Sequence, residues 1–211
     1  VESYQSLYLK AHHPLEFLVG VANNFGGFYR TEFYLHEAKR AGAVIEAPCV
    51  NASEELCSLV KGHDQSSVVG SAVAQASARK DVRRNNGQPT TNNSIHLGLG
   101  NIKGLTTEVA QLVLRERRRN GSFADLPDLL RRVPLHVEQA RILVRVGALR
   151  FTGRSKPELL WDLALMHQGS KSADPIPDLF VMKVEAPRLP DLQHYPLADA
   201  YDELELLGFP L

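Results

Sequence analysis

The sequence predicts a mainly α-helical protein with little β-structure, in which a small helical subdomain precedes a module of repeated helical turns. Two observations support this prediction. Apolar residues recur at intervals of three and four over most of the chain, which is the spacing of one helix face, and glycine or proline separates successive segments. The composition, 44% hydrophobic and 23% charged over 211 residues, is typical of one or two globular domains with real cores.

The stretch 95–119 is the most informative part of the chain. A glycine-rich apolar lead-in ends in a Lys-Gly-Leu-Thr turn at residues 103–106, and an amphipathic helix follows. Thr106 is a good N-cap because its hydroxyl accepts a hydrogen bond from a first-turn N–H group. A tight glycine turn at a helix N-terminus directs backbone N–H groups outward, where they bind phosphate, and Lys103 adds a positive charge. These features predict a helix-hairpin-helix, which clamps the nucleic-acid backbone without reading its sequence.

The usual hairpin is Gly-apolar-Gly, and Thr106 stands in place of the second glycine. An ordinary glycine turn before a helix is therefore the alternative interpretation of this stretch alone. A second copy weakens that alternative, because residues 146–149 form another apolar glycine turn. A helix then begins at Ser155, which makes a capping box with Glu158. The repeat predicts a tandem helix-hairpin-helix module over residues 95–169.

The charge is unevenly distributed, although the net charge of the chain is zero. Residues 95–156 contain 12 Lys or Arg and 5 Asp or Glu, a net charge of +7, and this block coincides with the two hairpins. Residues 1–60 carry −3 and residues 170–211 carry −5. A basic module of this kind is expected to make phosphate contacts that weaken with added salt.

Residues 1–60 are predicted to form the small helical subdomain. Four helices are expected, over residues 4–10, 15–23, 31–41 and 54–59. Asn51 or Ser53 is the expected N-cap of the last one, and residues 44–46 are expected to be extended. His12 and His13 are assigned no catalytic role, because adjacent residues of a helix do not face each other.

The two connecting regions have different compositions. Residues 61–94 are rich in Ser, Ala, Asn and Gln and are predicted to be a flexible linker, with a short helix at 73–78. Residues 170–211 are predicted to be a proline-rich connector with a short acidic helix over 199–207. Cys49 and Cys57 lack CxxC spacing, so they are expected to be reduced structural residues rather than metal ligands.

The remaining helices follow the second turn and link the two turns. The helix after Ser155 is expected to bury one apolar stripe, formed by Leu159, Leu160, Leu163 and Ala164. Between the turns, Gly121 is expected to end the first long helix, and two amphipathic helices follow around residues 126–133 and 137–144.

Several strings, taken in chain order, match the pattern of one protein family. They lie at residues 4–17, 48–53, 97–105, 143–149, 153–161 and 203–209. The chain resembles the C-family bacterial replicative DNA polymerases, the DNA polymerase III alpha subunit. The first string resembles the late fingers segment, the second a Pro-Asp-Val-Asn-x-Ser stretch, the next three the two hairpins, and the last the segment before an oligonucleotide-binding (OB) fold.

The resemblance implies that residues 1–60 belong to the fingers, which face the incoming nucleotide and the template. It also implies that the tandem module grips the primer-template duplex through its phosphates. The DNA-binding residues carried over are Lys103, Gly104, Leu105 and Thr106 in the first hairpin, and Val146, Gly147, Ala148, Arg154, Ser155 and Lys156 in the second. The chain departs from the family pattern at Thr106 and at Cys49, where Gly and Asp are usual, and its 61–94 connection is longer.

The sequence offers no Asp-x-Asp pair on a strand that would hold the metal ions of phosphoryl transfer. The resemblance places those carboxylates in a palm domain before Val1 and the OB fold after Leu211. The chain is therefore expected to be a fragment of a nucleotidyltransferase that binds double-stranded DNA but is inactive alone, with no catalytic residue, metal or cofactor of its own. Mg²⁺, deoxynucleotide triphosphates, a sliding clamp and other replisome subunits are expected to bind the parent polymerase elsewhere.

Two other functions stay open at this point. One is a stand-alone helix-hairpin-helix DNA-binding or repair accessory protein. The other is a protein-interaction scaffold in which the glycine turns only connect helices. The helical segment before the linker has no role in a bare DNA clamp, which favours the polymerase. A cytoplasmic location without membrane contact is expected, since no apolar run approaches about 18 residues and no signal peptide begins the chain.

Overall fold

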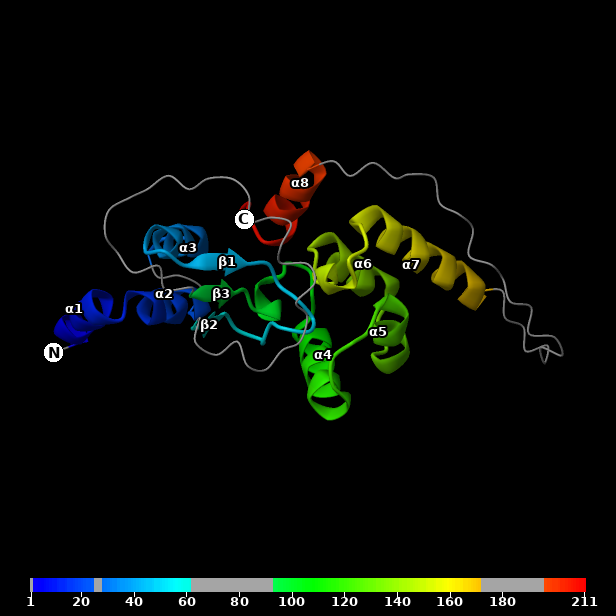
Figure 1. Cartoon of the computed structure of the whole chain (residues 1–211), viewed down its shortest axis with the longest axis horizontal. Helices are drawn as coiled ribbons and strands as arrows, with labels where there is room; N and C mark the ends of the chain where they lie inside the picture. Colours follow the sequence, from blue (N-terminus) through cyan, green and yellow to red (C-terminus); the bar gives the residue numbers. More distant parts are fainter. Residues whose placement is uncertain (1, 25–27, 62–92, 172–195) are drawn as a thin grey trace.

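The computed structural model describes residues 2–24, 28–61, 93–171 and 196–211, and most of them are helical (Figure 1). The mainly α-helical prediction is confirmed. The α-helices are α1 (Glu2–His12), α2 (Pro14–Asn23), α3 (Thr31–Arg40), α4 (Thr107–Asn120), α5 (Leu126–Arg132), α6 (Val137–Arg145), α7 (Lys156–Lys171) and α8 (Pro196–Leu206). Two short 3₁₀ helices are η1 (Leu99–Asn101) and η2 (Arg150–Thr152). The predicted helix at 73–78 and most of both predicted connectors lie outside the described residues.

A small three-stranded sheet joins the two halves of the described chain. It consists of β1 (Val44–Glu46), β2 (Ser58–Val60) and β3 (Ser94–His96), in the order β1-β3-β2. Strand β3 runs parallel to β1 and antiparallel to β2. Helix α3 packs on β1 and α2 packs on β2 (Figure 1). The central strand therefore comes from a different part of the chain than its two neighbours.

The predicted helix at 54–59 is wrong, because this segment turns and then enters β2. Neither expected N-cap caps a helix. The hydroxyl of buried Ser53 accepts a hydrogen bond from the N–H of Cys49 at 2.9 Å. The Asn51 amide donates to the carbonyl of Phe123 at 2.9 Å and accepts from its N–H at 2.8 Å. Six residues make a marginal helix in isolation, so these tertiary contacts decide the conformation.

The backbone after Ser53 is held by the segment that follows β3. The N–H of Leu99 donates to the carbonyl of Glu54 and that of Gly100 to the carbonyl of Glu55, both at 2.9 Å. This close approach requires glycine at position 98. A Cβ there would lie 2.4 Å from the carbonyl oxygen of Glu55.

The caps and the helix end predicted for the later helices are confirmed. Thr106 caps α4, since its hydroxyl accepts a hydrogen bond from the N–H of Val109 at 3.4 Å. Ser155 and Glu158 form the expected capping box at α7. Gly121 ends α4 with a φ of 79°, a conformation that residues with a Cβ rarely adopt.

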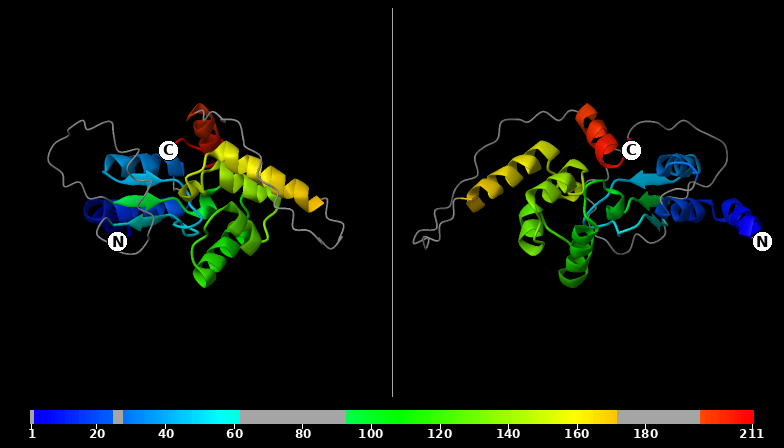
Figure 2. Two further views of the ribbon diagram at one scale, coloured as in Figure 1. Left: turned by 45° about the vertical axis from the view of Figure 1, so that its right-hand side comes forward. Right: turned by 180° about the vertical axis from the view of Figure 1, so that it is seen from behind.

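The core of the described residues runs from α2 through the sheet to α7 as one apolar cluster. Helices α5 and α6 contribute fully buried residues, among them Leu129 and Leu143. Helix α7 extends away from this body in both views of Figure 2. For that reason only its first turns are covered: Leu159 and Leu163 are buried, whereas Ala164 is exposed, which corrects the predicted stripe.

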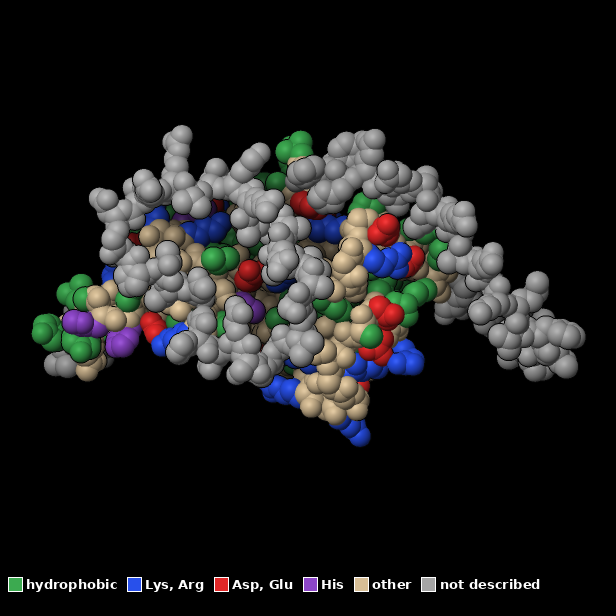
Figure 3. Space-filling model, viewed as in Figure 1, with side chains coloured by type: hydrophobic (Ala, Val, Ile, Leu, Met, Phe, Trp, Pro, Cys, Tyr) green, Lys and Arg blue, Asp and Glu red, His purple; other side chains and the backbone are tan. Residues whose placement is uncertain are grey.

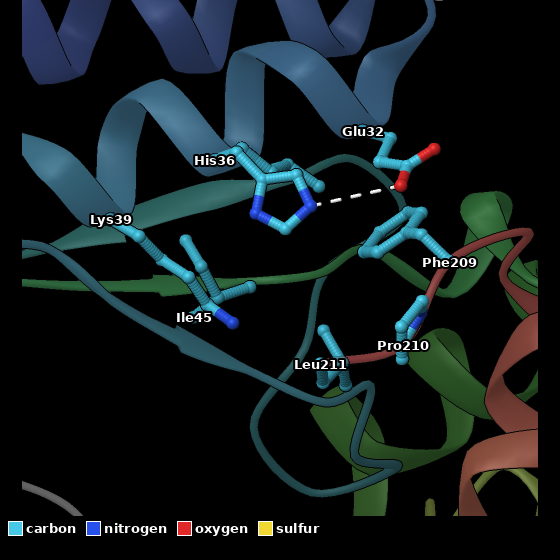
Figure 4. Close-up of a pocket in the computed structure, with 8 residues that line it drawn as sticks. Glu32, His36, Lys39, Ile45, Phe209, Pro210 and Leu211 are labelled. Atoms are coloured by element: carbon cyan, nitrogen blue, oxygen red, sulfur yellow. Dashed lines mark ion pairs between the residues drawn. The ribbon is translucent and has the colours of Figure 1, made fainter.

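The C-terminal segment packs back onto the first half of the chain. Phe209 is 8% exposed, and Phe209, Pro210 and Leu211 line a small hollow with Ile45 of β1 and His36 of α3 (Figure 4). Residues that follow α8 therefore close the space between α3 and the sheet.

Both cysteines are buried and free, as expected. Burial raises the pKa of the Cys57 thiol, whose sulfur accepts a hydrogen bond from the Asn101 amide at 3.2 Å. In the part of the chain that the structure describes, no three His, Cys, Asp or Glu side chains converge on a point that would hold a metal ion. None of the described helices has the length and apolar character needed to cross a membrane.

Candidate nucleic-acid interface

The first glycine turn links η1 to α4 and is exposed. Gly104 has a φ of 81°, which favours glycine, and Lys103 and Thr106 are exposed beside it. Leu105 is partly buried and packs against the core. A Cβ at Gly104 would lie 3.1 Å from Cδ1 of Ile142 in α6. The turn therefore rests directly on α6 while its outer side faces solvent.

A glutamine near the start of α6 holds this turn in place. The Gln139 side-chain N–H donates to the carbonyl of Gly104 at 2.9 Å, and its side-chain oxygen accepts from the N–H of Thr106 at 3.0 Å. Sequence reasoning missed Gln139, since nothing in the chain marks a glutamine 35 residues away as a partner of the turn. The two hydrogen bonds fix the backbone on both sides of Leu105.

Three backbone N–H groups of the first turn stay available. Those of Gly104, Thr107 and Glu108 have no acceptor among the described residues, and the last two belong to the first turn of α4. Unpaired N–H groups at a helix N-terminus form an anion-binding site, because they and the helix dipole both favour negative charge. The N–H of Lys103 is not available, because it donates to the carbonyl of Leu206 at 2.8 Å.

The second predicted turn differs from the first because its N–H groups are paired and the residues on either side of Gly147 are buried. Val146 and Ala148 are 2% and 0% exposed. The N–H of Gly147 donates to the carbonyl of Val144 at 3.0 Å, and that of Ala148 to Leu143 at 2.9 Å. This arrangement is a Schellman motif that ends α6. The N–H groups of these residues are therefore engaged within α6, and the DNA contacts expected of Val146, Gly147 and Ala148 stay a prediction.

The exposed glycine turn of the second repeat lies a few residues later, at Gly153. Gly153 has a φ of 71° and is exposed. One residue, Arg154, separates it from the hydroxyl cap Ser155, just as Leu105 separates Gly104 from Thr106. The two turns differ, however, in how many of their backbone N–H groups are free. That of Ser155 donates to the Glu158 carboxylate at 2.9 Å and that of Arg154 to the Thr152 hydroxyl at 3.4 Å. The second repeat therefore offers fewer free donors than the first.

Most cations of the basic block are neutralised by carboxylates within the protein. Nine of the 12 Lys and Arg in residues 95–156 form ion pairs: Arg117, Arg118, Arg131, Arg132, Arg141, Arg145, Arg150, Arg154 and Lys156. Among these, Arg154 pairs with Asp162, and Lys156 pairs with Asp199 at 2.8 Å. The +7 block is thus less cationic at its surface than its composition indicates.

Helix α8 supplies the carboxylates that face the second repeat. Arg145 lies 2.7 Å from a carboxylate oxygen of Asp202 and also pairs with Glu205. Lys156 lies 4.0 Å from the other oxygen of Asp202. These contacts bring the acidic C-terminal helix against the helix-capping turn of α6 and the start of α7. Lys156 and Arg145 are therefore engaged by α8, while Lys103 makes no ion pair with a described carboxylate.

Comparison with known proteins agrees with this architecture. The sequence profile of the helix-hairpin-helix motif family matches residues 42–159. This chain belongs to the helix-hairpin-helix family. The match begins before β1, which is consistent with a sheet that joins β1 and β2 to β3. The domain boundary predicted at residue 95 stays a prediction.

The chain is also similar to bacterial DNA polymerases with curated names. The chain is 29% identical over 204 residues to an error-prone DNA polymerase of Mycobacterium bovis, covering 96% of this chain and 15% of that protein. It is 34% identical over 146 residues to a DNA polymerase III subunit alpha of Rickettsia prowazekii, covering 64% and 12%. For an error-prone DNA polymerase of Pseudomonas fluorescens, the identity is 30% over 163 residues, covering 77% and 14%. The chain thus spans about 15% of the length of these relatives or less, and the predicted resemblance is confirmed.

The contact between α8 and the helix-hairpin-helix module predicts a specific titration behaviour. The Arg145 guanidinium lowers the pKa of the Glu205 carboxyl below its ordinary value of 4.5, chiefly through a hydrogen bond. Because the folded-state pKa is depressed, the contact contributes stability above pH 4.5 that is lost as the pH falls through the folded pKa. We expect NMR titration of the side-chain carboxyl carbon to give a midpoint below 4.5 for Glu205. In the Arg145→Gln variant the midpoint should return to the ordinary range, and an unchanged midpoint would contradict the contact.

Proposed function

We propose that this chain is the part of a bacterial C-family DNA polymerase that holds the primer-template duplex by its phosphates during DNA replication. The observation that carries the proposal is the Gly104 turn, in which three unpaired N–H groups lie at the N-terminus of α4 beside Lys103. Phosphate contacts of this kind position a duplex without reading its bases. The family match and the polymerase relatives support this assignment.

The alternative is a stand-alone helix-hairpin-helix DNA-binding or repair accessory protein. The similarity to the mycobacterial polymerase extends over 96% of the chain, and so includes α1 to α3, which a bare DNA clamp does not need. This extent favours the polymerase. We place the protein in the cytoplasm, where its DNA partner lies.

Nucleotide addition belongs, in this proposal, to other segments of the polymerase. Phosphoryl transfer uses carboxylates that hold two metal ions, and the described residues contain no cluster that fits Mg²⁺. The Mg²⁺ ions, the deoxynucleotide triphosphates and any sliding clamp would therefore bind elsewhere in the whole enzyme. We expect no primer extension by this chain alone, and clear incorporation of nucleotides would overturn this part of the proposal.

The duplex-holding role is tested by fluorescence anisotropy with labelled duplexes of unrelated sequence at several salt concentrations. The affinity of the wild-type chain should fall steeply with salt. Lys103→Glu should weaken binding to all sequences alike and reduce the slope of log affinity against log salt by about 1, as expected for one phosphate contact. Lys39→Glu is the matched control, since it makes the same charge change at an exposed site on α3.

The outcomes separate the candidate functions. Absent binding, or binding that does not depend on salt, would favour the scaffold interpretation in which the glycine turns only connect helices. A loss in Lys103→Glu that depends strongly on the duplex sequence would contradict a phosphate clamp, because phosphates carry no base information.

A further inference from the structure

Two arginines of α4 remain without a carboxylate partner. Besides Lys103, Arg115 and Arg119 are the cations of the basic block that form no ion pair with a described carboxylate. Both side chains are exposed. Figure 3 shows Lys and Arg side chains gathered over the end of α4 that projects from the body. Among the described residues of the basic block, the unpaired positive charge therefore lies on α4 and at Lys103 rather than at the second turn.

The two arginines lie on one face of α4, in line with its N-terminus. They are four residues apart, and Arg115 is seven residues after Glu108, so all three positions share a face of the helix. At about 1.5 Å per residue, Arg115 and Arg119 lie about 12 Å and about 18 Å along the helix from Thr107. The free N–H groups of the Gly104 turn and the two guanidinium groups thus form a track along one side of α4, on which the exposed Glu108 also lies.

A hollow of about 280 Å³ lies beside this track. It is lined by Leu112, Arg115, Glu116, Arg119, Arg132, Val133 and Pro134. Glu116 lies 3.3 Å from Arg132 and accepts a hydrogen bond from Asn120. These two contacts lower the pKa of the Glu116 carboxyl more than the nearby charge of Arg119 does. The net charge of the hollow is therefore set by Arg115 and Arg119.

Arg132 is committed to the fold and offers little to a ligand. Its guanidinium donates to the carbonyls of Glu116, Gly121 and Ser122 and lies 4.3 Å from the centre of the Phe123 ring.

Arginines near a helix C-terminus also interact favourably with the helix dipole. This effect accounts for Arg119, which lies in the last turn of α4. It does not account for Arg115, which lies before that turn.

We propose that Arg115 and Arg119 bind backbone phosphates of the duplex that the Gly104 turn holds, so that phosphate contacts continue along α4. This inference rests on the proposed function. Arginine suits the role because its planar guanidinium binds phosphate through two parallel hydrogen bonds. The track lengthens the contact with DNA beyond the two hairpin turns, and it partly replaces Arg154 and Lys156, which carboxylates occupy.

The test compares two double variants with the same change in net charge. Arg115→Gln/Arg119→Gln should reduce the slope of log affinity against log salt by about 1.8, the value expected for two phosphate contacts on duplex DNA. Arg131→Gln/Arg141→Gln is the control. Its arginines are 79% and 49% exposed, and each already pairs with a carboxylate of its own helix, so the slope should change little. The probe is a labelled 20-base-pair duplex, titrated between 50 and 200 mM KCl.

Each outcome bears on one proposal. Equal slopes for the two double variants, with a steep wild-type slope, would overturn the α4 track and leave the duplex-holding function intact. A flat wild-type slope would instead overturn the proposed function itself. Arg115→Lys/Arg119→Lys should restore the wild-type slope of log affinity against log salt, because lysine keeps the charge. Its affinity should stay below that of the wild type, because lysine loses the paired hydrogen bonds. Thermal unfolding checks that the variants fold, and if the glutamine pair does not, Arg119→Gln alone should lower the slope by about 0.9.

Discussion

Gly98→Ala is expected to destabilise the protein by about 3 kcal/mol or more, at the upper end of the cost of overpacking. The added Cβ would lie 2.4 Å from both the carbonyl oxygen of Glu55 and the carbonyl carbon of Leu56. These are backbone atoms, so rotation of a side chain cannot relieve the overlap. The neighbouring hydrogen bonds, from Leu99 to Glu54 and from Gly100 to Glu55, would have to lengthen or break for the segments to separate.

Gly20→Ala is the control for this substitution. Gly20 lies within α2, and a Cβ there would meet no atom within 4 Å. Alanine should therefore stabilise this helix by up to about 1 kcal/mol, because glycine has the lower helix propensity. Urea unfolding followed by circular dichroism measures both changes. A cost below about 1 kcal/mol for Gly98→Ala would contradict the close approach between residues 54–56 and 98–100.

Arg117→Met should have the second largest effect, a loss of about 2–4 kcal/mol in the free energy of unfolding. The Arg117 side chain is 11% exposed. Its guanidinium donates to the carbonyls of Ser53 at 2.7 Å and Val50 at 3.1 Å, and it pairs with Glu54. Val50 and Ser53 are themselves fully buried. Methionine fills similar space but leaves these acceptors without a donor, which is the costly part of the change.

Arg118→Met separates this effect from the loss of a surface charge. Arg118 also pairs with Glu54, at 2.7 Å, but its side chain is 68% exposed. Exposed ion pairs contribute about 0–1 kcal/mol, so this variant should unfold at nearly the wild-type urea concentration. Equal losses for the two variants would show that Arg117 acts through charge alone and not by satisfying buried carbonyls.

Sequence reasoning was most successful where the decisive contacts are local. The N-cap Thr106, the capping box of Ser155 with Glu158, and the helix end at Gly121 each depend on residues within a few positions of one another. It failed at residues 54–59, where the conformation depends on partners far along the chain. The hydrogen bonds between Asn51 and Phe123 span 72 residues, and no local sequence pattern identifies such a partner.

The candidate site shows the same contrast between features set by local contacts and features set by distant ones. The sequence located the exposed turn at Gly104 and the glycine turn at Gly147, but it gave no sign that α6 uses the N–H groups at Gly147 or that Gly153 is the more exposed of the two later glycines. Both glycines have positive φ, 77° and 71°, and both follow a helix, α6 or η2. The difference between them is burial, which depends on the packing of the surrounding helices and not on the turn itself.

The sequence by itself determined most of the helices, their caps, the family and the position of the exposed glycine turn at Gly104, because helix periodicity, capping and glycine conformation act over a few residues. Only the tertiary structure decided which charges remain free. Arg145 and Asp202 are 57 residues apart in the chain, and their pairing depends on where α8 packs. Composition counts such cations as unpaired, whereas the fold pairs them with carboxylates and leaves Lys103, Arg115 and Arg119 without an ion pair among the described residues.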